Sequence, residues 1–175
     1  MKRISIIIGS ASANSANAHL AAYVKKRMEP EFEVRIFNEL KALPHFDPEL
    51  STNTPPESII NFRKEIERAD GVLISTPEYV FSIPSGLKNA IEWCVSTTVF
   101  SDKPTALLTA SSDGKKGHEE LQLIMKTLTA KFNEETTLLV SGIKGKISSD
   151  GIIMDRPLEE KLGHFIERFR NLLTS

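Results

Sequence analysis

Apolar and polar residues form two patterns that alternate along the chain, one typical of strands and one typical of helices. Short apolar runs typical of buried strands lie at 4–8, 71–76, 105–110 and 136–140, and residues 32–37 largely alternate apolar and charged side chains, as an edge strand does. Between these runs, apolar residues recur every three or four positions, which predicts helices. The expected helices run from about 15 to 28, 54 to 69, 84 to 95, 121 to 132 and 158 to 172.

This alternation of strands and helices predicts an α/β protein, with one parallel sheet covered by helices on both faces. We expect a single domain over residues 1–175. Thr54 and Glu57 have the spacing of a capping box for the second helix, and Val95 continues the apolar stripe of the third. The stretch from Asn38 to Thr54 has no clear period and is expected to be an irregular loop.

A doubly wound sheet of five strands commonly has the order 2-1-3-4-5, and its ligands bind beyond the carboxyl ends of the strands, where the strand order reverses. That point lies between the first and third strands. The segments to inspect are therefore 9–17 and 76–86, with 111–117 beside them. These segments are also the least ordinary loops in the sequence.

The first of these loops reads GSASANSAN and opens directly onto a helix. Small residues let the backbone approach a ligand closely, and the free N–H groups of a helix N-terminus favour an anion such as phosphate. The alternative is that its Ser and Asn residues simply cap the helix. The dinucleotide pattern GxGxxG is absent, and DGKKG at 113–117 lacks the spacing of a P-loop, so a nucleoside triphosphatase is not expected.

Composition narrows the function classes further. Of the 175 residues, 40% are hydrophobic, which is ordinary for a globular protein. The formal net charge is −1, so there is no electrostatic reason to expect nucleic acid or a membrane surface as a partner. The only cysteine, Cys94, sits on an apolar helix stripe, and no internal disulfide can form. The apolar run near the N-terminus is too short for a signal peptide, so we expect a cytoplasmic protein. The four histidines show no paired ligand spacing, and no metal is expected.

Two motifs together resemble the NADPH-dependent FMN reductase family. They are GSxxxxSxN at residues 9–17 and PEYxxSIPxxLKNAIEW at residues 77–93, in the family's loop order. The resemblance implies a flavodoxin-like fold, bound FMN, and NADPH or NADH as co-substrate. It also implies a small electron acceptor, such as a quinone, an azo compound or a metal oxyanion like chromate, and a homodimer or homotetramer whose subunits complete each other's flavin pockets.

The resemblance also implies which residues contact FMN. The phosphate group would be held by the first loop, through Ser10, Ser12, Ser15, Ala16 and Asn17. The isoalloxazine ring would be wrapped mainly by backbone groups of the second loop and closed on its far side by the third, through Pro77, Glu78, Tyr79, Val80, Ser82, Ser111 and Gly114. No catalytic side chain is implied, because the flavin carries the chemistry.

The chain departs from the family at a few positions. Ser12 stands where the family often has Arg, and Val80 where it often has Asn. These differences favour an alternative interpretation, in which the protein is a flavodoxin-like binding protein that has lost flavin or catalysis. A second alternative is an electron carrier like flavodoxin without NAD(P)H-dependent reductase activity, but the chain lacks a strongly acidic docking charge.

Overall fold

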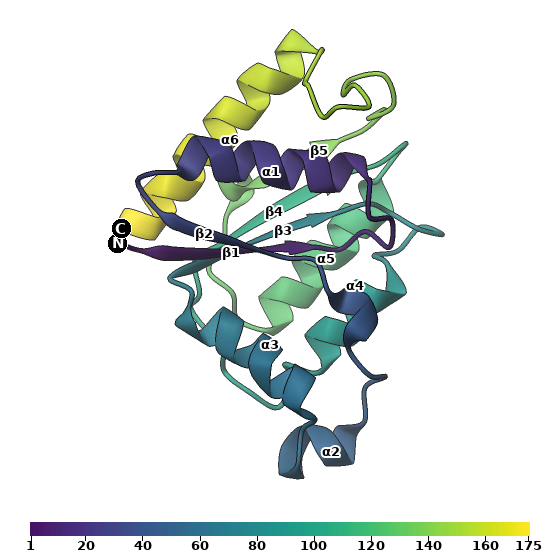
Figure 1. The fold of residues 1–175 in the computed structure, drawn as a ribbon, viewed down its shortest axis with the longest axis vertical. Coiled ribbons are helices and arrows are strands. Elements are labelled where there is room, and N and C mark those ends of the chain that lie inside the picture. Colours follow the sequence, from purple (N-terminus) through teal and green to yellow (C-terminus); the bar gives the residue numbers. More distant parts are fainter.

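The computed structural model describes all residues from Met1 to Ser175, and a five-stranded parallel sheet lies at its centre (Figure 1). Its strands are β1 (Arg3–Ile8), β2 (Glu33–Phe37), β3 (Gly71–Thr76), β4 (Thr105–Ala110) and β5 (Thr137–Val140). They lie in the order β2-β1-β3-β4-β5, so the predicted class and strand order are confirmed. Every residue of β3 and β4 is buried, whereas β2 at the edge is partly exposed, as its alternating pattern predicts.

Helices cover both faces of this sheet (Figure 1). One face carries α1 (Ala16–Met28) and α6 (Arg156–Thr174), and the other carries α3 (Glu57–Arg68), α4 (Ser85–Glu92) and α5 (Lys115–Thr127). A short helix α2 (Pro48–Asn53) and two 3-10 turns, η1 (Leu40–Ala42) and η2 (Glu134–Thr136), complete the elements. None of these helices has the length and apolar character needed to cross a membrane.

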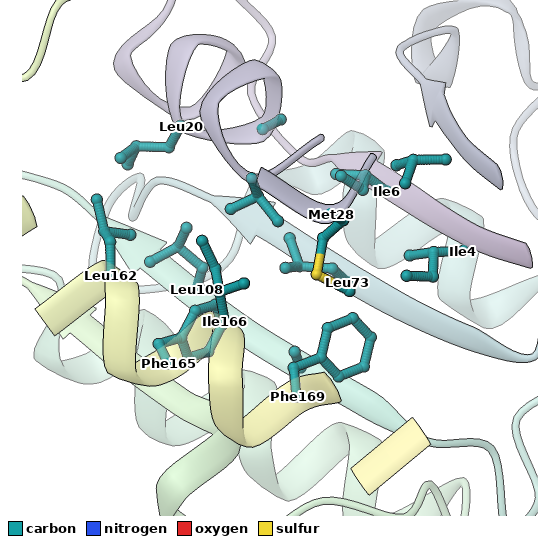
Figure 2. Close-up of a cluster of buried hydrophobic side chains, with 14 of the residues drawn as sticks. Ile4, Ile6, Leu20, Met28, Leu73, Leu108, Leu162, Phe165, Ile166 and Phe169 are labelled. Carbon is teal, nitrogen blue, oxygen red and sulfur yellow. The ribbon is translucent and has the colours of Figure 1, made fainter. Parts of the chain in front are cut away.

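The sheet separates two apolar cores because successive strand residues point to opposite faces. In β3, Leu73 faces the core under α1 and α6, while Val72 and Ile74 face the core under α3, α4 and α5. Figure 2 shows the first core, in which α6 places Phe165 and Phe169 against the strands. These cores fix the sheet and thereby the positions at which its carboxyl-edge loops begin.

Several helix boundaries differ from the sequence prediction. The expected capping box is wrong: α3 has Pro56 at its N-cap without a side-chain hydrogen bond, and Thr54 instead ends α2. Val95 is 61% exposed because α4 already ends at Glu92 and the chain turns away from the stripe. The fourth predicted helix is α5, which starts earlier than expected, at Lys115, and ends at Thr127.

The segment 38–54 is more ordered than its sequence suggests. It contains η1 and α2, and it is held against α4 by two donors, the Asn89 carboxamide and the Trp93 indole N–H, each 2.9 Å from the Pro44 carbonyl. Phe46 packs edge-on against Trp93, with ring centroids 5.5 Å apart. The expected irregular loop is therefore a fixed strap along α4.

Candidate functional site

A pocket opens at the carboxyl edge of the sheet, between the ends of β1 and β3. It has a volume of about 160 Å³ and is formed by the loop after β1, the start of the 38–54 segment, Tyr79 and the start of α4. Its lining residues are Gly9, Ser10, Ala11, Ser12, Ala13, Asn38, Leu40, Lys41, Tyr79, Pro84, Ser85 and Gly86. This is where the strand order reverses, so the place predicted from topology is the place where the pocket lies.

The β1 loop (residues 9–15) ends at the N-terminus of α1. Ser15 is the N-cap, and its side chain accepts the Ala18 N–H at 3.1 Å. Ala16 and Asn17 form the first turn, which contains no acidic residue, and N–H groups in a first turn have no partner within the helix. This helix end therefore keeps a positive character that an anion can use.

Ser10 and Tyr79 connect the β1 loop to the loop after β3. Their hydroxyl oxygens lie 3.3 Å apart, and the Ser10 oxygen also accepts the Ser12 N–H at 3.2 Å. Ser10 is buried, whereas the side chain of Ser12 is exposed beside the pocket. The two loops that the sequence singled out thus meet in the structure.

Asn17 has a different environment from its neighbours in the β1 loop. Its buried carboxamide donates to the Ala110 carbonyl at 2.9 Å, and its oxygen accepts the Ser75 hydroxyl at 3.2 Å. The side chain thus ties α1 to β3 and β4. Of the Asn17 groups, the backbone N–H in the first turn of α1 is the one left for a ligand.

The β3 loop (residues 77–84) contains a tight turn with an unusual backbone. Tyr79 and Ser82 exchange two backbone hydrogen bonds of 2.9 and 3.1 Å, and the two residues between them have positive φ, 52° at Val80 and 59° at Phe81. Such primed turns normally carry Asn and Gly. Non-glycine residues in this region cost on the order of 1–3 kcal/mol each, and strain of this kind clusters at ligand sites.

This turn also presents apolar surface. The Val80 side chain is 95% exposed and that of Phe81 73%, beside the half-exposed Tyr79. Exposed apolar residues gathered on a strained turn next to a pocket suit a flat apolar ligand. The sequence gives no sign of this conformation, because YVFS lacks the Asn-Gly signal of such a turn.

Two carboxylates connect the β3 loop to α5. Glu78 accepts the Gly117 N–H at 2.8 Å and the Gly114 N–H at 3.3 Å, so it caps α5 from outside the helix. In return, Glu120 accepts the Ser82 hydroxyl at 2.6 Å and the Ile83 N–H at 2.8 Å. Glu120 is not among the residues predicted from the sequence, and no local pattern marks it, since its partners lie 37 and 38 positions away.

The loop after β4 lies beside the β3 loop, as expected. The Ser111 hydroxyl is 3.4 Å from the Glu78 carbonyl, and Gly114 adopts φ 86° at the N-cap of α5. A Cβ atom on Gly114 would lie 2.9 Å from Leu139, so both the backbone and the packing require glycine there. Of the residues expected to contact the ring, Pro77 and Gly114 are buried, and the others are partly or fully accessible.

Two further titratable side chains, those of His118 and Cys94, are buried in the fold. His118 is buried, its Nδ1 atom lies 2.8 Å from the Thr109 hydroxyl, and burial lowers its pKa below the ordinary 6.5 despite the nearby Glu119. Cys94 is buried just after the end of α4, and burial raises the pKa of its thiol to about 12. No group of three or more His, Cys, Asp or Glu side chains is placed to hold a metal ion.

Comparison with known proteins finds one matching family and several relatives that are named reductases. Residues 2–141 match the model of the NADPH-dependent FMN reductase family. The chain is 27% identical to a quinone reductase of Escherichia coli, over 94% of this chain and 95% of that protein. It is 28% identical to an NADH:(hydroxy)cinnamate reductase subunit of Vibrio ruber, over 95% and 83% of the two chains.

A further curated relative is subunit 2 of an NADH-dependent flavin reductase of Lactobacillus johnsonii, 31% identical over 76% of this chain and 72% of that protein. Among solved structures, a flavoenzyme NAD(P)H:(acceptor) oxidoreductase from Paracoccus denitrificans superimposes with a TM-score of 0.79, covering 99% and 98% of the two chains at 24% identity. That likeness establishes the flavodoxin-like fold.

Proposed function

This chain belongs to the NADPH-dependent FMN reductase family, and we propose that it passes electrons from NAD(P)H to a quinone or a similar small acceptor. The family makes it an FMN-dependent NAD(P)H oxidoreductase. The observation that carries the proposal is the meeting of two loops at one pocket. The β1 loop lines the pocket and leads into the N-terminus of α1, which has no acidic residue in its first turn, and Tyr79 brings the β3 loop with its exposed apolar turn to the same pocket. FMN has a matching phosphate end and a flat ring end.

The residues around the pocket fit FMN. We infer that its phosphate is held by Ser10, Ser12, Ser15 and the backbone N–H groups of Ala16 and Asn17, where no acidic side chain of the first turn repels it. The ring would lie along the β3 loop and the start of the β4 loop, against Pro77, Glu78, Tyr79, Val80, Ser82, Ser111 and Gly114. When bound, FMN supplies the hydride chemistry, by accepting hydride from NAD(P)H and giving electrons to the acceptor.

The role of the protein itself is then to bind FMN and to orient it toward the acceptor. A quinone, an azo compound or a metal oxyanion needs access to the ring face more than it needs a catalytic acid, because the flavin carries the chemistry. The quinone is the favoured acceptor class because the Escherichia coli relative, matched over nearly its whole length, is named a quinone reductase. A flavodoxin-like carrier or binding protein is the weaker alternative, since the named relatives are reductases.

We further propose one flavin-binding domain over residues 1–175 that assembles as a homodimer or homotetramer in the cytoplasm. The exposed Val80 and Phe81 support assembly, because a second subunit would shield them. The lone buried Cys94 agrees with a reducing compartment.

The direct test uses the purified protein with FMN in the absence of oxygen. We expect FMN to bind, NADPH or NADH to bleach its visible absorption, and a stoichiometric amount of benzoquinone to restore it. Protein that binds FMN but is not bleached by either nucleotide would support the carrier. Protein that binds no FMN would contradict the proposed function, and sedimentation velocity on the same sample measures the assembly.

A further inference from the structure

We propose that Glu120 of α5 is a positioning residue for the flavin, because it fixes the strained turn at Val80 and Phe81 in the shape that the ring contacts. This inference rests on the proposed function, since it assumes that the β3 loop binds FMN. Glu120 itself lies outside the pocket lining and outside every loop expected to touch the flavin.

The contacts of Glu120 are aimed at the base of the turn. One carboxylate oxygen accepts both the Ser82 hydroxyl at 2.6 Å and the Ile83 N–H at 2.8 Å. Ser82 is also the residue whose backbone closes the turn with Tyr79. Hydrogen bonds to an ionised carboxylate are shorter and stronger than neutral ones, so this oxygen restrains the backbone directly after the turn.

The turn needs such a restraint. Val80 and Phe81 both hold positive φ, and both residues are largely exposed, so packing within the chain does little to oppose relaxation of the turn. Within the loop, two backbone hydrogen bonds between Tyr79 and Ser82 hold this conformation. A backbone held in a sparsely populated region persists only where its surroundings over-determine it.

The N-terminal side of the turn is also tied to α5, through the side chain of Glu78. Glu78 precedes the turn and accepts the Gly114 and Gly117 N–H groups of α5, whereas Glu120 receives its hydrogen bonds from residues after the turn. Gly117 permits this close approach, because a Cβ atom there would lie 3.2 Å from the Glu78 side chain and 3.3 Å from the Ser82 carbonyl. The turn is thus anchored to one helix at both of its ends.

This anchoring predicts an effect on affinity without any contact to FMN. When only a fraction of molecules holds the binding-competent turn, the apparent dissociation constant rises in inverse proportion to that fraction. In the protein without FMN, Glu120 keeps a high fraction of molecules with the turn in its binding-competent conformation.

The test compares Glu120→Ala and Glu120→Gln with the matched variants Glu119→Ala and Glu119→Gln. Glu119 is a matched control, because it is adjacent on the same helix, exposed, and paired with Lys116 at 2.8 Å away from the turn. We expect Glu120→Ala to raise the FMN dissociation constant, measured by flavin fluorescence, by roughly tenfold or more, as for lost hydrogen bonds to a charged group. Glu120→Gln keeps an acceptor oxygen and should recover part of the affinity, and Glu119→Ala should match the wild type.

A second readout needs no flavin. Hydrogen exchange of the apoprotein should be faster in residues 79–83 of Glu120→Ala than in the wild type, and unchanged in Glu119→Ala. Wild-type affinity and exchange in a folded Glu120→Ala variant would overturn the inference. If that variant does not fold, equal affinity in Glu120→Gln and Glu119→Gln would overturn it. A wild-type protein that binds no FMN would instead overturn the proposed function, and the exchange rates would still decide whether Glu120 holds the turn.

Discussion

At the scale of single residues, Val80 has a backbone conformation that suits its side chain poorly. A β-branched residue at φ 52° is strained, whereas Asn tolerates this region, and Val80 is 95% exposed within its own subunit, so the apoprotein subunit has little packing there to lose. We expect Val80→Asn to raise the free energy of unfolding by about 1 kcal/mol and the melting temperature by about 2–4 °C. Val95→Asn, at another exposed valine without positive φ, should give no gain. A lower melting temperature for Val80→Asn would show that the turn is not strained.

His118 makes stability depend on pH. Burial lowers the pKa of its imidazole from the ordinary 6.5, so the folded state favours the neutral ring beside Thr109. The unfolded state then binds more protons, and the stability contribution is fully present above the unfolded pKa and is lost as pH falls through the lowered folded pKa. Urea unfolding between about pH 7 and about pH 5 should show this loss in the wild type. His118→Asn, which retains a polar partner for Thr109, should lose less stability over this pH range. If the free energy of unfolding falls equally with pH in both proteins, His118 is not the group responsible.

At the scale of elements, Arg63 joins three helices. From α3 its guanidinium donates to the Ser51 carbonyl and hydroxyl of α2 and to the Trp93 carbonyl at the end of α4. We expect Arg63→Ala to lower the free energy of unfolding by about 2 kcal/mol and to speed hydrogen exchange most in residues 48–54. Arg68→Ala, at an exposed position on α3, is the control. Exchange that rises evenly over the whole chain would mean that Arg63 supports the fold in general and not the strap.

At the scale of the whole molecule, FMN binding should stabilise the fold. A ligand that binds only the native state adds about 2.7 kcal/mol at a hundredfold excess over its dissociation constant. For a domain of this size, we expect the melting temperature to rise by roughly 5–11 °C, which thermal scanning measures directly. Riboflavin lacks the phosphate expected at the N-terminus of α1, so it should give a clearly smaller rise at equal concentration. Equal shifts would argue that the β1 loop does not bind phosphate.

The parts of this molecule that could be predicted are those fixed by burial and topology. β3 and β4 are buried on both faces, so their sequences are short, mainly apolar runs without charged residues, which are typical of central strands. The site's location followed from strand order alone, because ligands bind where that order reverses. The α3 capping box failed because Pro56 occupies the cap and offers no side-chain acceptor.

The parts that could not be predicted depend on contacts between distant residues. Asn17 reads as one more polar group in a ligand loop, yet its carboxamide anchors α1 to Ala110, 93 positions away. Glu120 reads as an ordinary charge on a helix, and only the fold brings it to Ser82. The residues YVFS give no local signal for positive φ, and the groups of α5 that contact this loop reach it only in the folded structure.

The first and last residues meet at the amino edge of the sheet, across the molecule from the pocket (Figure 1). The Lys2 ammonium group donates to the Leu173 carbonyl, so a short peptide could join the two ends without crossing the surface. The chain should therefore tolerate circular permutation, with new ends placed in an exposed loop away from the pocket. For the same reason, tethering the protein to an electrode by either end would leave the pocket facing outward, open to soluble electron acceptors.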